Sequence, residues 1–374
     1  SRSSYSSRRE EADESLPYAG PNRIRFDGFV SAIVAPRASA DSSTGHASQL
    51  SSGPPRGRAS PDASFRKRDA TDMQKPTLIH AALTYGTFPL VFGGALGLGI
   101  YGMARGWNPV FTAMGLTGAV VLSLLVLERV HPYQEEWLHS HGDVRTDLIH
   151  NLVNFWIPEV YTVAFVGGLT AAASWLSNAV GADLWPSQWP LFAQLLLALL
   201  IGEVGTYWIH RLMHEHEFLW RFHAAHHSAP RLYWLNAGRF HPIDLFAQQF
   251  LAVTPLVLLG ADTRVIALHT LFTAVHGMFQ HANLDIRLGP LNWFFSMAEL
   301  HRWHHSKHLE EANTNYGANI ILWDIVFGSR FLPSDRLPPK EIGIEALPEF
   351  PRGYWAHLFS PFRWKQVQET GRAN

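Results

Sequence analysis

Six histidines stand within nineteen residues of this chain, in the stretch HRLMHEHEFLWRFHAAHHS at 210–228. A buried imidazole needs a partner for each ring nitrogen, so crowding histidines together is costly unless they share a task. Neutral imidazole is the commonest nitrogen ligand for iron, zinc, copper and nickel. The stretch therefore predicts a metal site, to which other parts of the chain add ligands and a scaffold.

Three histidine motifs have the spacing of a helix face. HRLMH places two imidazoles at i and i+4, and HAAHH and HRWHH each place three at i, i+3 and i+4. Eight convergent imidazoles exceed the needs of one ion with about four to six ligands, so two ions, or one ion with spare ligands, are both open. The eight are His210, His214, His223, His226, His227, His301, His304 and His305.

The composition points to a membrane as the surroundings of these motifs. Of 374 residues, 47% are hydrophobic and only 16% are charged, whereas soluble domains average about 25% charged residues. There is no cysteine, which excludes disulfides, thiolate metal sites and cysteine nucleophiles. The formal net charge of -1 gives no electrostatic reason to expect a nucleic-acid partner.

Long apolar runs predict helices that cross a bilayer. Four runs of about 20 residues carry almost no charge, which makes a soluble bundle of buried helices the weaker interpretation. Two shorter runs predict a helical hairpin embedded in the membrane. The four long runs are 82–103, 109–127, 151–176 and 190–209, and the hairpin covers 243–260 and 265–279. We therefore expect an all-α integral membrane helical bundle with about four transmembrane helices.

The distribution of Lys and Arg predicts how the bundle is oriented. Basic residues precede the first run, lie between the second and third, and follow the fourth, whereas the loop 177–189 has none. The positive-inside rule then places the N-terminus, the loop 128–150 and everything after His210 in the cytoplasm, although Arg105 opposes this assignment. The histidine motifs would form a metal-binding cap on the cytoplasmic side.

The chain divides into three parts by composition. Residues 1–72 include 15 serines and lack any helical or strand period, so we expect a disordered tail outside the functional protein. An organellar transit peptide is the alternative, which the several acidic residues fit poorly. Met73 precedes the first apolar run. We expect a membrane-embedded domain at 73–340 and a C-terminal tail at 341–374.

The ordered motifs resemble those of the fatty acid hydroxylase / sterol desaturase superfamily. HRLMH, HAAHH and HRWHH follow in that order, and NYG and WDIVFGS trail the last motif. The resemblance implies a membrane oxygenase with two iron ions that uses O2 and external electrons. Carried over residue by residue, it assigns the eight histidines above as ligands. It adds His281, in FQHANL, and His276 is a further candidate five residues earlier.

Groups that support the ligands are expected too, because a ligating imidazole usually donates its other N–H to a carboxylate or carbonyl. Glu203 lies seven residues before His210 inside an apolar run, where an unpaired acid is costly. Asp147 stands at the start of the third run, and Asn315 and Asp324 resemble family positions. Helix capping or loop hydrogen bonds are the alternative for all four.

We expect an O2-dependent oxidoreductase that hydroxylates a membrane lipid at a fatty acyl, sterol or headgroup C–H bond. The motif contexts resemble lipid hydroxylases and alkylglycerol monooxygenases, although a lipid or sterol desaturase or an ether-cleaving monooxygenase shares the chemistry. The chain has no HPGG haem motif. Electrons would therefore come from a separate donor of cytochrome b5, ferredoxin or reductase type.

A membrane zinc protein, either non-catalytic or a transporter, is the alternative from another class, and an all-imidazole ligand set does not exclude zinc. A zinc protease would carry a glutamate after its first histidine, as in HExxH. This chain has Arg211 there. A transporter would place its ligands at mid-span, whereas these motifs follow the fourth run.

Overall fold

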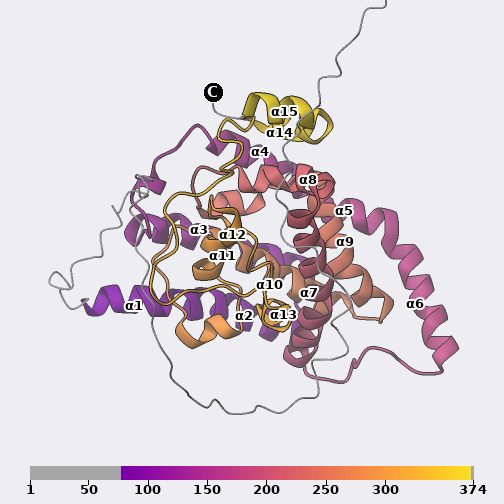
Figure 1. Ribbon diagram of the computed structural model, residues 1–374. Helices are drawn as coiled ribbons and strands as arrows, with labels where there is room; N and C mark the ends of the chain where they lie inside the picture. Colours follow the sequence, from indigo (N-terminus) through magenta and orange to yellow (C-terminus); the bar gives the residue numbers. More distant parts are fainter. Residues whose placement is uncertain (1–76, 372–374) are drawn as a thin grey trace, which may run out of the picture. The chain divides into compact units, whose positions relative to one another are not determined.

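The computed structural model describes residues 77–371, which fall within one unit of the chain, Lys75–Asn374. These residues form helices and loops without a β-strand (Figure 1), so the predicted all-α class is confirmed. The expected tail at 1–72 lies outside the described residues. The domain boundaries therefore stay predictions.

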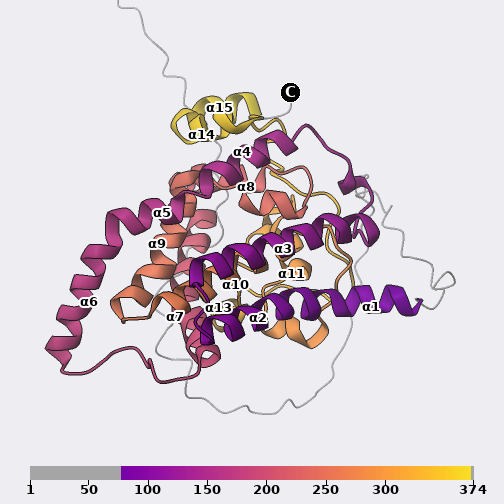
Figure 2. The ribbon, with the colours of Figure 1, turned by 180° about the vertical axis from the view of Figure 1, so that it is seen from behind.

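Four helical segments are long and apolar enough to cross a membrane, as predicted. Each is longer than the apolar run that predicted it, because flanking residues continue the helix. They are Leu78–Ala104 (α1, Leu78–Thr87; a π-helical turn, Phe88–Phe92; α2, Gly93–Ala104), Pro109–Val130 (α3), Val144–Val180 (α4, Val144–Asn154; α5, Ile157–Tyr161; a π-helical turn, Thr162–Val166; α6, Gly167–Val180) and Leu191–Glu215 (α7). In Figure 2, α2 and α3 lie side by side, and α4 to α6 follow one another along the bundle.

Local sequence signals set the ends of these helices. The Asn108 side chain accepts a hydrogen bond from the Phe111 N–H at 3.1 Å, and Pro109 follows it at the first position of α3. Gly181 ends α6 with a φ of 73°, a left-handed conformation that glycine adopts without strain. The local sequence therefore determines where these helices begin and end.

Large apolar side chains on the spans face outward. Leu90, Leu122 and Val163 are 75%, 67% and 86% exposed, and they come from three different spans. A soluble bundle would bury most such residues, whereas a bilayer solvates them with hydrocarbon. The fold is that of an integral membrane protein.

The predicted hairpin segment forms two helices, each of which packs against α7 rather than closely against the other. They are α9 (Pro242–Leu258) and α10 (Thr263–His281), and the Asp262 side chain caps α10. α10 packs against α3 and α7 and buries Leu268 and Phe279 completely. This packing carries the end of α10 to the histidine motifs.

Two glycines let α7 approach α9 closely. A Cβ at Gly205 would lie 2.6 Å from the Leu251 carbonyl oxygen, and one at Gly202 would lie 3.1 Å from the Ala252 oxygen. Backbone atoms cannot move aside as a flexible side chain does, so a larger residue here would push the helices apart. The two glycines thus set the spacing of the helix that carries His210.

Short helices form a cap around the end of α7. They are α8 (Glu217–His227), a 3-10 turn (Trp234–Gly238), α11 (Ala298–His304), α12 (Leu309–Ala312), α13 (Leu322–Phe327), α14 (Tyr354–Phe359) and α15 (Trp364–Gly371). Helices α14 and α15 lie within the segment expected as a C-terminal tail. Trp364 and Val367 are buried in a cluster with Ala224 of α8.

Candidate metal centre

Four helices bring nine of the predicted ligands together in the cap. α7 contributes two, α8 three, the end of α10 one, and α11 with the residue that follows it three. All nine side chains are buried, and the most exposed of them is only 6% accessible. They are His210, His214, His223, His226, His227, His281, His301, His304 and His305.

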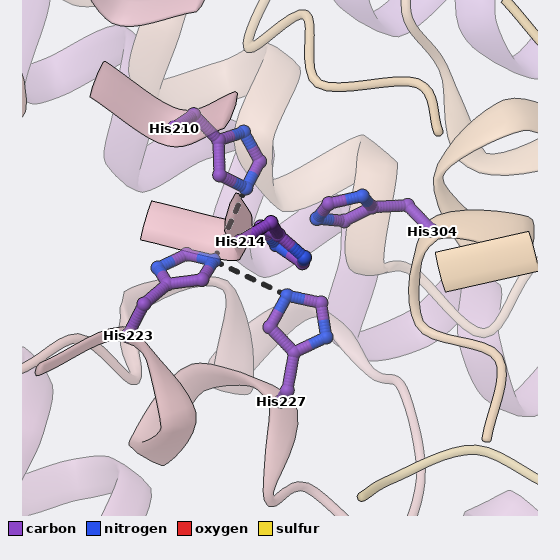
Figure 3. Close-up of side chains that lie close together, drawn as sticks. All are labelled: His210, His214, His223, His227 and His304. Carbon is purple, nitrogen blue, oxygen red and sulfur yellow. Dashed lines mark hydrogen bonds between the residues drawn. The ribbon is translucent and has the colours of Figure 1, made fainter. Parts of the chain in front are cut away.

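The nine imidazoles form two groups, in each of which the ring nitrogens lie within 4.8 Å of one another. The first histidine group contains His210, His214, His223, His227 and His304, whose rings converge in Figure 3. The second histidine group contains His226, His281, His301 and His305. The groups adjoin, because the rings of His227 and His305 stack with centroids 4.4 Å apart.

Each HxxHH motif supplies both groups. His223 and His227 are separated by one helical turn and enter the first group, whereas His226 enters the second. In the other motif His304 enters the first group, and His301 and His305 enter the second. Successive residues on a helix point about 100° apart, so the paired histidines of each motif diverge. Each motif therefore contributes histidines to both histidine groups.

Hydrogen bonds orient most of the rings through Nδ1. His210 Nδ1 lies 2.7 Å from the Tyr316 carbonyl oxygen, His223 Nδ1 2.8 Å from a carboxylate oxygen of Asp244, and His304 Nδ1 2.8 Å from the Thr314 carbonyl oxygen. These oxygens accept only, so each Nδ1 carries the proton and donates. In a neutral ring the Nε2 lone pair is then free to bind a metal.

The free lone pairs face one another. Nε2 of His210 lies 3.1 Å from Nε2 of His223 (Figure 3), although both rings donate through Nδ1. Two neutral rings in these tautomers cannot hydrogen-bond to each other, and two facing lone pairs repel. Nε2 of His214 and of His304 is also buried without a partner. A cation among the nitrogens removes both penalties, so the donor set fits a transition metal.

Burial keeps the imidazoles in the form that binds metal. The pKa values of His227, His304 and His305 lie well below the ordinary value, first because burial disfavours the charged ring and then because other imidazoles surround it. These rings are therefore neutral at neutral pH. A neutral ring keeps one nitrogen lone pair for a metal.

His276, the further candidate, lies in neither group. It is fully buried on α10, and its ring stacks on Phe272 with centroids 5.6 Å apart and faces Phe92 and Phe295. Five residues correspond to about 500° of helical rotation, which is 140° away from the face of His281. This angle is the reason that α10 brings only His281 to the groups.

Two of the predicted supporting acids brace the same loop. Both oxygens of Glu203 accept hydrogen bonds from Asn319, at 2.8 and 2.9 Å, and Asp324 accepts from the N–H groups of Tyr316 and Gly317. Burial raises the pKa of Asp324 to about 6. Neither acid hydrogen-bonds to a grouped histidine. Their contact with the site runs through the loop whose Tyr316 carbonyl orients His210.

The other two predicted supporting residues also contact the histidine groups only through intermediate residues. Asp147 accepts hydrogen bonds from the Arg239 guanidinium and from the Tyr233 hydroxyl. The Arg239 carbonyl in turn lies 3.3 Å from His226 Nδ1. Asn315, with a φ of 54°, joins the Leu300 carbonyl at the start of α11 to Phe331. Neither residue hydrogen-bonds to a grouped histidine.

Sequence reasoning missed three side chains that do hold grouped histidines. Asp244 contacts His223, Asn236 contacts His281 at 2.9 Å, and Asn313 contacts His214 at 3.1 Å. Asp244 is a lone acid at the start of the apolar helix α9, the same signal that singled out Glu203. Asn236 lies in the 3-10 turn Trp234–Gly238 and Asn313 in a loop, where no spacing rule pairs them with a histidine.

Known proteins share this chain's motifs. The fatty acid hydroxylase family model matches residues 195–329, which include all nine grouped histidines. Ornithine lipid hydroxylase OlsE of Rhizobium tropici is 39% identical over 261 residues, which cover 69% of this chain and 77% of that protein. The chain belongs to the fatty acid hydroxylase family.

More distant relatives match only part of this chain. Alkylglycerol monooxygenase of Danio rerio is 31% identical over 41% of this chain and 33% of its own length. A very-long-chain aldehyde decarbonylase of Oryza sativa is 28% identical over 41% of this chain and 60% of its own length. No solved structure matches the chain significantly. The hydroxylase and monooxygenase relatives support an oxidoreductase that acts on lipid.

Proposed function

We propose that this protein is an O2-dependent lipid hydroxylase with two iron ions, one in each histidine group. The observation that carries the proposal is the pair of adjoining all-imidazole groups in which Nε2 lone pairs face each other. Nine imidazole nitrogen donors suit iron, and a family of lipid oxygenases favours iron over zinc. Such a centre supplies the oxidising power that side chains lack.

The residues of the chain position the reaction and shield it. Nδ1–H bonds to main-chain carbonyls and to Asp244 fix the ring orientations, and almost complete burial keeps bulk water away. Hydroxylation inserts one oxygen atom of O2 into a C–H bond and reduces the other to water with two electrons and two protons. We propose that a separate redox protein delivers the electrons on the cytoplasmic face.

For the substrate we propose a membrane lipid, with an aminolipid such as an ornithine lipid as the first candidate. The support is the 39% identity to an ornithine lipid hydroxylase, which extends over most of both chains. Ether cleavage of an alkylglycerol is the second candidate, supported by the likeness to alkylglycerol monooxygenases. That likeness covers only about a third of those proteins, which is why it ranks below hydroxylation.

Mass spectrometry of total lipids tests the proposal, in a host that makes ornithine lipids and supplies a redox partner. Wild type should convert one lipid class to a product heavier by one oxygen, and His304→Ala should abolish the product. His308→Ala is the matched control, because His308 is exposed and lies in neither group. Loss of two hydrogens would indicate a desaturase, and loss of ether lipids an ether-cleaving enzyme. Identical profiles from wild type and His304→Ala would contradict lipid oxidation.

A further inference from the structure

A cavity of about 350 Å³ lies on the cap, beside the histidine groups but outside them. Its walls come from the residues before and at the start of α4 (141–146), those after α8 (228–230) and the segment 342–353. This volume is within the range of about 300–1,000 Å³ that is usual for small-molecule sites. No residue of either histidine group lines it.

The charged side chains that line the cavity are mostly cationic. Arg239, Lys307 and Arg352 line it, and the one lining acid, Asp143, is paired with Arg231 at 2.8 Å. Lys307 and Arg352 have their own acidic neighbours, Glu341 and Glu349, at 3.7 and 4.0 Å. Those pairs are solvent-exposed and therefore weak. The cavity is thus suited to an anion.

A second observation concerns Arg239. The residue is 3% exposed and donates through Nε to Asp147, whereas its Nη2 is buried and has no hydrogen-bond partner among residues 77–371. An unsatisfied buried guanidinium N–H is costly, and an oxyanion removes that cost with a charge-assisted hydrogen bond. Guanidinium geometry matches carboxylate and phosphate in particular.

The cavity's position and its apolar wall indicate an amphiphile. Ile344, Leu347 and Phe350 line one side, and the lining residues 141–146 include the first turn of the candidate span Val144–Val180. On the neighbouring α14, which packs against α4, Trp355 is 66% exposed. Exposed aromatic residues at the end of a span are typical of the headgroup level of a bilayer.

Main chain separates the cavity from the histidine rings. The Arg239 carbonyl accepts a hydrogen bond from His226 Nδ1, and Arg239 also lines the cavity. The N–H of Gly343, another lining residue, donates to the His305 carbonyl at 3.2 Å. An anion in the cavity would therefore touch residues that hold the second histidine group without reaching its nitrogens.

We propose that this cavity binds the oxyanion of an anionic lipid headgroup, with Arg239 at its buried end and Lys307 and Arg352 at its rim. The shared chemistry is a phosphate or carboxylate group, and a free anion is the alternative source. The proposal goes beyond the proposed function, since it requires neither iron nor turnover.

Isothermal titration calorimetry on the full chain in a neutral detergent tests this site at low salt. The probes are dihexanoyl phosphatidic acid, neutral dihexanoyl glycerol and inorganic phosphate. Wild type should bind the phosphatidic acid saturably, and Lys307→Gln/Arg352→Gln should weaken that binding about tenfold. Arg363→Gln/Lys365→Gln is the matched control, because it removes two exposed charges from residues that do not line the cavity. Arg239→Lys should also weaken binding, since lysine cannot reproduce the guanidinium fork.

The outcomes separate the sources and can overturn the site. Phosphatidic acid binding much more tightly than inorganic phosphate supports a lipid headgroup, and equal affinities support a free anion at the same residues. Equal affinity for the neutral lipid, no saturable binding, or identical losses in the rim and control variants would each overturn the proposal. Binding is measured without turnover, so a failure here leaves the hydroxylase proposal untouched.

Discussion

At the scale of single residues, the site depends on groups that hold imidazoles rather than on the imidazoles alone. Asp244 is fully buried and accepts from His223 Nδ1, so its charge both fixes the tautomer and makes Nε2 a better donor to a metal. The remaining side-chain supports are neutral amides, Asn236 and Asn313. Asp244 is therefore the support whose loss should matter most.

We expect Asp244→Ala to lower metal affinity about 10- to 100-fold, as loss of a partner that orients a ligand usually does. The measurement is metal retained per chain after dialysis against graded chelator concentrations. Asp183→Ala, in an exposed loop outside the groups, is the control and should retain metal like wild type. Equal retention by the two variants would mean that Asp244 does not support a bound metal.

At the scale of helices, the close approach of α7 and α9 places His210 and Asp244 around His223. Gly202 and Gly205 make this approach feasible, since a Cβ at either position would meet main-chain atoms of α9. By contrast, a Cβ at Gly115 on α3 would meet nothing within 4 Å. Substitution by alanine should therefore destabilise the protein at Gly202 or Gly205 but not at Gly115.

We expect Gly205→Ala to destabilise the protein by about 1–3 kcal/mol through overpacking against Leu251. Gly115→Ala should be neutral or stabilising by up to about 1 kcal/mol, because alanine favours the helix. Thermal unfolding of both variants in the same detergent compares them. Similar melting temperatures for the two variants would show that α7 and α9 do not need the glycine contact.

At the scale of the whole molecule, the fold brings three distant stretches of chain into two adjoining sites. His304 and His305 are neighbours in sequence, yet they enter different histidine groups. The motif spacing left open whether there are two metal sites or one site with spare ligands, and two separate histidine groups favour our proposal of two.

We expect about two metal ions per chain in wild type, with iron predominating after growth in iron-replete medium. His304→Ala and His305→Ala should each lower the metal content, and the double variant should abolish it, whereas His308→Ala should have no effect. Elemental analysis against quantified protein decides this. One ion per chain, lost equally in both single variants, would contradict two sites, and zinc without iron would favour the zinc-binding alternative.

Much of this structure could be predicted from the sequence, because it depends on the properties of short stretches of chain. Uncharged runs of about 20 residues need a bilayer, so the four spans followed from composition and length, and the two shorter apolar runs form helices as expected. Helical periodicity similarly brought out the HxxxH and HxxHH motifs, and nine of the ten candidate histidines meet in the two groups. The one left out, His276, points about 140° away from His281 on the same helix.

Only the tertiary structure decided how these histidines divide and what holds them. The split of His226 from His227 depends on the direction in which α8 points relative to α10 and α11, which no local pattern records. Asn236 and Asn313 come from a 3-10 turn and a loop that distant packing places beside the histidines, and Glu203 braces a loop rather than a grouped histidine. Hydrogen bonds across more than 40 residues depend on the whole fold, which is why sequence spacing predicted which histidines gather better than it predicted their hydrogen-bond partners.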